Sequence, residues 1–109
     1  MPQAKNDDLL IKKHQWESLI RQTNSVLKDL HDLRLQIREE LNSLTELKKK
    51  YPESERIPER VHQNNQSLER IAVMIQETQE QLKSYHQQQD AIDAALDSSR
   101  KPQSGRHSF

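Results

Sequence analysis

The chain has no cysteine and little glycine, proline or aromatic character. Its 109 residues include one Gly, four Pro and 4% aromatic residues. Without cysteine it can form no disulfide framework and supplies no thiolate ligand for zinc. A phosphate-cradling loop needs clustered glycines, and Gly105 stands alone near the C-terminus. These absences exclude disulfide-stabilised modules, cysteine-ligated zinc folds and phosphate-binding loops.

An excess of charge of one sign is also missing. Seventeen Lys and Arg balance seventeen Asp and Glu, so the formal net charge is zero. A neutral chain has no bulk attraction to nucleic acid or to an anionic membrane, and we expect neither as a partner. No apolar run reaches the length of a membrane span, and residues 1–5 lack the apolar core of a signal peptide. We expect a cytoplasmic location, or a nuclear one, with no direct insertion into a membrane.

What the chain does have is a regular apolar stripe in its second half. The stripe advances in alternating steps of four and three residues, the spacing of a heptad repeat, and it predicts a long helix lying along another helix. Its positions are Ile57, Val61, Asn64, Leu68, Ile71, Ile75, Thr78, Leu82, Tyr85, Gln89, Ile92 and Leu96.

The first half carries a wider stripe. A strict spacing of seven runs through Leu9, Trp16, Thr23, Leu30, Ile37, Leu44 and Tyr51. Further apolar residues lie three positions on, at Leu19, Val26, Leu33 and Leu47, and four positions on, at Ile20, Leu27 and Leu41. A stripe of this width is typical of a helix buried in a bundle rather than of a narrow two-helix seam.

Two prolines near the middle separate the two stripes. Pro52 and Pro58 each remove a backbone donor and push the preceding residue out of the helical region. We therefore predict a flexible N-terminus over 1–6, a helix over 7–50, a turn over 51–57, a helix over 58–97 and a disordered tail over 98–109. The fold class is all-α, an elongated antiparallel two-helix coiled-coil hairpin within a larger helical bundle. A continuous kinked helix in a parallel dimer is the alternative.

The hairpin hypothesis also gives a register. Folding the chain at the centre of the predicted turn places Leu33 opposite Ile75, Leu30 near Thr78 and Trp16 near Ile92, so that apolar layers meet apolar layers. It also places Leu35 level with Val73 and Met74.

Several apolar residues lie off both stripes, and a thin hairpin needs more burial than its own stripes supply. We predict a partner interface at these positions, with Trp16 as a candidate hot spot. The candidate interface residues are Leu9, Leu10, Ile11, Trp16, Leu35, Val73 and Met74.

Three polar residues interrupt the second stripe: Asn64, Thr78 and Gln89. Buried polar groups cost stability, but they can set the register and the number of associating helices. We expect either that role or a loosely packed, wet seam.

No arrangement of residues suggests catalysis, and we expect a protein that is not an enzyme and takes no cofactor or metal. The five histidines are scattered, and the closest approaches to ligand spacing are His14 with Glu17 and His86 with Asp90. A carboxylate-bridged metal site in a bundle needs inward-facing Glu-x-x-His pairs on two helices. These two pairs do not match that pattern and lie off the stripes.

The segment 33–85 combines a long helix, a short acidic turn with prolines and a second helix. Its pattern is carried by the run 33–41 before the turn and by Val61, Leu68, Ile71, Ile75 and Leu82 after it. This layout resembles the snapin-type subunits of the lysosome-related-organelle biogenesis complexes. The resemblance implies a small helical subunit of an elongated hetero-oligomer that links organelles to trafficking machinery, with no catalytic residues. Small kinetochore and microtubule-associated subunits share the layout.

The leading hypothesis is a non-enzymatic coiled-coil assembly or scaffold subunit, acting in organelle trafficking or cytoskeletal attachment. Its partners would be other helical protein subunits, or a second copy of itself as a homodimer. Two alternatives stay open: a small helical chaperone or cofactor of the tubulin-binding type, and a homo-oligomeric coiled-coil regulator.

Overall fold

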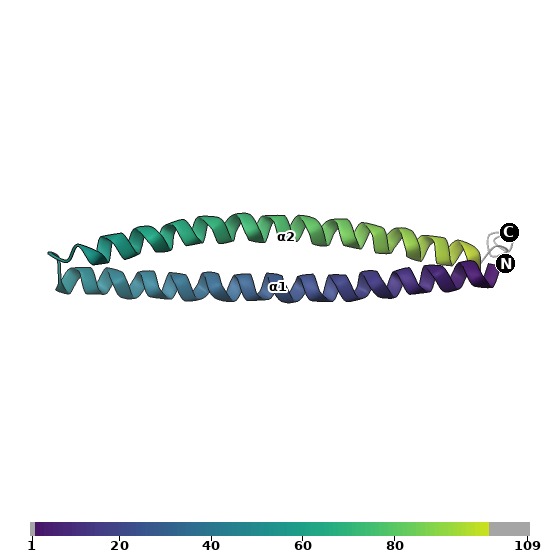
Figure 1. Ribbon diagram of the computed structural model, residues 1–109, viewed down its shortest axis with the longest axis horizontal. Coiled ribbons are helices and arrows are strands. Elements are labelled where there is room, and N and C mark those ends of the chain that lie inside the picture. The colour runs from purple at the N-terminus through teal and green to yellow at the C-terminus, as the bar shows by residue number, and fades with distance from the viewer. Residues whose placement is uncertain (1, 101–109) are drawn as a thin grey trace, which may run out of the picture. The chain divides into compact units, whose positions relative to one another are not determined.

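The protein is all-α and forms an antiparallel helical hairpin of two long helices (Figure 1). The computed structural model describes the backbone of residues 2–100 and the side chains of residues 6–98. Helix α1 spans Pro2–Lys50 and helix α2 spans Arg56–Arg100. No strand occurs within residues 2–100.

The ends of the helices differ from the predicted bounds. Helix α1 begins at Pro2 rather than at residue 7, because proline is well tolerated in the first turn of a helix, where its missing N–H has no partner to lose. Helix α2 begins at Arg56 rather than 58 and continues to Arg100 rather than 97. The predicted disordered tail lies outside the described residues from 101 onward.

The turn between the helices is short because both of its ends are fixed by specific hydrogen bonds. The Tyr51 N–H donates to the Leu47 carbonyl at 2.8 Å, and Pro52, which has no N–H, follows immediately. The Ser54 hydroxyl then accepts from the Ile57 N–H at 3.4 Å and so caps the start of α2. Lys48–Lys50 end α1, where positive charge complements the helix dipole.

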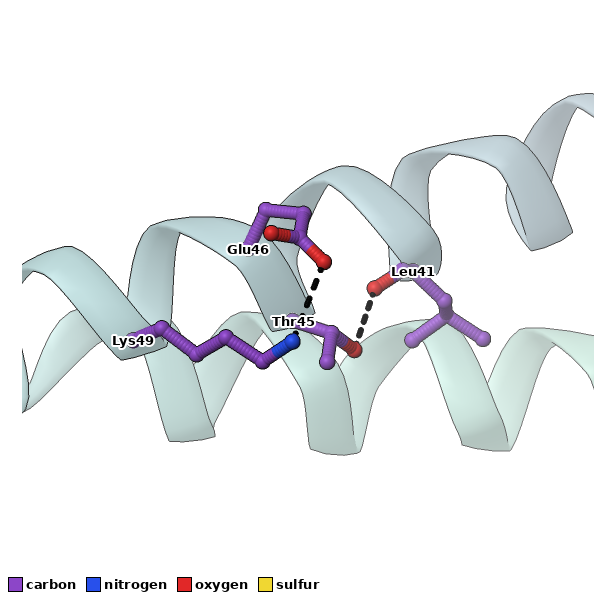
Figure 2. A network of polar contacts seen from close by, with 4 residues as sticks. All are labelled: Leu41, Thr45, Glu46 and Lys49. Carbon is purple, nitrogen blue, oxygen red and sulfur yellow. Dashed lines mark hydrogen bonds and ion pairs between the residues drawn. The ribbon is translucent and has the colours of Figure 1, made fainter.

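Exposed polar side chains near the end of α1 are satisfied within the same helix. Figure 2 shows Thr45 donating to the Leu41 carbonyl at 2.9 Å and Lys49 paired with Glu46 at 3.3 Å. Such exposed pairs contribute little stability, about 0.5 kcal/mol or less each. The helices must therefore be held by their buried faces.

The chain divides into two compact units, each made from one part of both helices. The first contains α1 up to Asn24 and α2 from Glu80; the second is Ser25–Gln79 and contains the turn. In the first unit Lys13 pairs with Asp93, and Trp16 stacks on Tyr85. From Lys13 to Trp16 the residue number rises along α1, while the residue number of the α2 partner falls, which shows that the helices are antiparallel in this unit.

In the second unit the core is a small apolar cluster. Leu30 packs with Ile71 and Ile75, all at most 7% exposed, and Leu27 and Ile37 pack against them. Burying a side chain of this size contributes about 1.5–3 kcal/mol, so these few residues carry much of the stability of the unit.

The buried face of α2 falls on the predicted stripe. Every one of its positions from Ile57 to Leu96 is buried or half-buried. On α1 the outcome is different from the prediction. Val26, Leu33 and Leu47, three positions beyond the seven-residue stripe, are exposed, as is Tyr51.

Up to Leu44, the α1 residues that face α2 are those of the seven-residue stripe together with the residues four positions after them. They advance in steps of four and three and are all buried or half-buried: Leu9, Lys13, Trp16, Ile20, Thr23, Leu27, Leu30, Arg34, Ile37, Leu41 and Leu44. A single partner helix covers a narrow seam, so it cannot also cover the second apolar line of a wide stripe. Lys13 and Arg34 are tolerated because their charged groups have polar partners, Lys13 pairing with Asp93 at 2.9 Å and Arg34 contacting the His31 ring at 2.8 Å.

The predicted register is wrong by about one to two helical turns. Leu30 packs on Ile71 and Ile75 rather than standing at Thr78. Trp16 does lie near Ile92, since both line one groove, but the ring that stacks on Trp16 belongs to Tyr85, two turns before Ile92. The turn ends at residue 55 rather than 57. In both of these contacts, the α2 partner is closer to the turn in sequence than was predicted.

Candidate functional site

The most informative feature of the surface is how much apolar side chain it exposes. Among the described residues, nine large apolar side chains are exposed and seven apolar side chains form the core. None of the large described side chains is fully buried. Isolated exposed apolar residues are ordinary, but exposed apolar residues that recur along one helix face are typical of a surface that another molecule covers.

Most of this exposed surface belongs to the Ser25–Gln79 unit. Its members there are Val26, Leu33, Leu35, Leu47, Tyr51, Val73 and Met74, between 42% and 61% exposed. The first unit contributes Leu10 and Ile11, at 50% and 57%. The candidate site therefore lies on the second unit.

The predicted interface residues divide into two groups. Leu10, Ile11, Leu35, Val73 and Met74 are about half exposed or more. Leu9 and Trp16 are half-buried, because both belong to the α1 face that contacts α2. Whether a partner binds these residues stays a prediction.

Trp16 lies in a groove of the first unit. Its ring centroid is 5.5 Å from that of Tyr85, with the planes tilted by 39°. Leu9, Leu19 and Ile92 form the apolar walls of the groove, and Gln88 and Lys12 lie at its rim. Trp16 therefore has an aromatic partner within its own chain, which weakens its case as a hot spot.

The sequence placed Val26, Leu33 and Leu47 in the buried stripe of α1, whereas the structure exposes all three. Val26, Leu33 and Leu47 share one face of α1 because they are spaced by multiples of seven. The signal was present in the sequence as the second apolar line of α1. Spacing alone could not decide which of the two lines faces α2.

An ion pair shows which face of α2 lies beside this line. Glu40 Oε1 accepts from Arg60 Nε at 2.9 Å, and Glu40 is seven residues after Leu33. The two side chains are 39% and 54% exposed. The Arg60 guanidinium holds the pKa of the Glu40 carboxyl below its ordinary value of 4.5, and this lowering outweighs the opposing effect of burial.

The polar residues of the α2 stripe behave differently from one another. Thr78 is buried, and its hydroxyl donates to the Met74 carbonyl at 2.7 Å, so the group is satisfied within its own helix. Thr23 of α1 does the same with Leu19 at 2.7 Å. Neither hydroxyl is needed for a contact between helices, so neither sets the register by a hydrogen bond across the seam.

Asn64 is the polar residue with an unmet need. It is 5% exposed, and its Nδ2 has no hydrogen-bond partner of good geometry among the described residues. The amide lies close enough to the Glu40 carboxylate to favour its charged form, which helps to lower the pKa of that carboxyl. Gln89 is half-buried in the first unit. Among the polar residues of the α2 stripe, Asn64 is therefore the one expected to cost the most folding stability and the strongest candidate for setting the helix register.

Other chemistry is sparse among the described residues. No three His, Asp or Glu side chains within 6–98 are grouped as a metal site would require. Neither α1 nor α2, over the residues described, has a stretch both long and apolar enough to cross a membrane.

Compared with family models, curated proteins and solved structures, the chain gives no match.

Proposed function

We propose that the protein is a non-enzymatic assembly subunit whose hairpin is completed by binding further helices. The observation that carries this proposal is the exposed apolar line of Val26, Leu33 and Leu47 on α1, within a set of nine exposed large apolar side chains. Two long helices that share one thin seam gain little burial, and most helical stability in proteins comes from packing of an apolar face. Covering the exposed line would supply the missing burial.

The spacing of the exposed line favours a helix as the occupant. Val26, Leu33 and Leu47 recur at multiples of seven, so a second helix lying along α1 would meet all three. We propose on the same spacing that the hairpin is a heptad-repeat coiled coil and that the finished assembly is a helical bundle. The resemblance to snapin-type subunits is the ground for proposing organelle trafficking as the process served.

Thermal unfolding followed by circular dichroism at several chain concentrations tests this proposal. An assembly subunit has a melting temperature that rises with concentration, because association stabilises the folded state. A chain that is poorly helical alone and becomes helical on co-expression with a helical partner would also support it. A cooperative melting transition independent of concentration, in a fully helical monomer, would contradict it and would favour a chaperone-like module.

A further inference from the structure

The ion pair between Glu40 and Arg60 fixes one level of a mixed face formed by both helices. Residues seven apart share a helix face, and the helices are antiparallel. On α1, the residues seven and fourteen positions before Glu40 are Leu33 and Val26. On α2, the residues seven and fourteen positions after Arg60 are Ser67 and Met74. We call these six residues the Leu33 face. All lie in the Ser25–Gln79 unit.

The Leu33 face has an apolar part and a charged part. Val26, Leu33 and Met74 are 50%, 44% and 48% exposed. The charged part is the Glu40–Arg60 pair, and both of its side chains keep access to solvent. Ser67 has the smallest side chain of the six and is half-buried. The three levels of the face therefore differ in chemistry. A molecule that binds the face must present complementary groups to the three levels in the same order along the helices.

We propose that the Leu33 face binds a second copy of this chain, an inference that rests on the assembly role proposed above. The two-fold axis runs parallel to the helices, so that α1 of one copy lies on α2 of the other at the same level. Glu40 then meets Arg60 of the second copy, Val26 meets Met74, and Leu33 meets the small side chain of Ser67. The interface is isologous, as expected for a symmetric dimer.

Charge selects this arrangement over the other two-fold axis. An axis perpendicular to the helices would lay α1 on α1, and Glu40 would then face either Glu40 or an apolar residue of the second copy. Like charges in contact, or a charge buried against an apolar side chain, are both unfavourable. With the axis parallel to the helices, two carboxylates and two guanidinium groups alternate, and each charge has two opposite neighbours.

Two single charge reversals test the pairing between copies. Glu40→Arg gives a chain with two positive groups on the face, and Arg60→Glu gives a chain with two negative groups. We expect light scattering to report a mass twice the 12.9 kDa of the chain for the wild type and the monomer mass for each variant alone. Mixing the two variants restores the dimer, because every contact across the interface is then between opposite charges.

The mixing result separates contacts between copies from contacts within one copy. Each variant keeps a like-charged pair inside its own hairpin, so recovery of the dimer mass can come only from pairing between chains. Leu33→Lys is expected to abolish the dimer. Asn42→Lys is the control, since Asn42 is exposed on α1 and lies outside the Leu33 face. Circular dichroism verifies that each variant remains helical.

The direction of the axis has its own test. The natural chain has no cysteine, so Glu53→Cys in the exposed turn accepts a single pyrene label. With the axis parallel to the helices, both turns lie at one end of the dimer, and excimer emission is expected. A dimer without excimer emission would overturn the proposed axis.

The outcomes distinguish this inference from the assembly role. A wild-type chain that is poorly folded alone and rescued only by a different helical protein overturns the second copy but leaves the assembly role standing. A stable helical monomer overturns both. Failure of the mixed variants to dimerise, with both still helical, overturns the Leu33 face as the interface.

Discussion

The ring of Trp16 stacks on the ring of Tyr85, with centroids 5.5 Å apart, and so ties α1 to α2 within the first unit. Tilted aromatic pairs of this kind contribute about 0.5–1.5 kcal/mol beyond the area they bury. We expect a coupling energy in that range from a double-mutant cycle of Trp16→Ala and Tyr85→Ala, measured by urea unfolding. Strictly additive effects would show that the two rings are neighbours without interacting.

The apolar cluster of the second unit should be the part most sensitive to truncation. Leu30 is 7% exposed and packs on Ile71 and Ile75. Leu30→Ala is expected to lower the free energy of unfolding by about 2–5 kcal/mol, because it removes contacts and leaves a cavity. Leu35→Ala, at a 57% exposed position, should change it by about 0.5 kcal/mol or less. Similar losses from both variants would contradict the assigned core.

Asn64 carries a cost that an apolar residue would remove. Its Nδ2 is buried without a hydrogen bond, and an unsatisfied buried group costs about 1–3 kcal/mol. Asn64→Leu is therefore expected to raise the free energy of unfolding by about that amount in urea titrations. If Asn64 also fixes how many helices associate, the variant should populate additional species in sedimentation velocity. A destabilised variant would mean that the amide is satisfied in solution.

Acid should remove the contribution of the Glu40–Arg60 pair. The pKa of Glu40 is below 4.5 in the folded chain because of the Arg60 guanidinium, so the unfolded chain binds the proton more readily. The stabilisation is present above pH 4.5 and is lost as the pH falls through the folded pKa. We expect wild type to melt at a slightly higher temperature than Glu40→Gln near neutral pH and the difference to vanish well below 4.5. The effect is small because the pair is solvent-accessible.

A difference that persisted unchanged into acid would show that Glu40 acts through packing rather than charge. Lys49→Gln offers a comparison, because Lys49 pairs with Glu46 in an exposed position within one helix. That variant should show a smaller dependence on pH than Glu40→Gln.

The sequence predicted the two helices and the buried face of α2 because both rest on local rules. Pro52 ends α1 through the loss of a donor, and the stripe from Ile57 to Leu96 has one spacing without a competitor. In α1 two apolar lines compete, one through Ile20 and one through Leu33. Periodicity gives both lines equal weight, and only the pairing with α2 shows that the Ile20 line is buried.

The register could not be predicted for a related reason. A shift of one or two helical turns keeps apolar layers opposite apolar layers, so the stripe scarcely distinguishes Ile92 from Tyr85 as the neighbour of Trp16. The discriminating contacts are specific ones, the aromatic pair at Trp16 and the ion pair at Glu40. The candidate site followed from the register, because the Leu33 face is assembled only once Glu40 and Arg60 are placed together.

Completion of the hairpin by association can be tested by light scattering across a dilution series. Mass and helicity are recorded on the same samples of the wild-type chain. We expect a mass of twice 12.9 kDa at high concentration, with mass and helicity falling together on dilution. A mass of 12.9 kDa with full helicity at every concentration would contradict it.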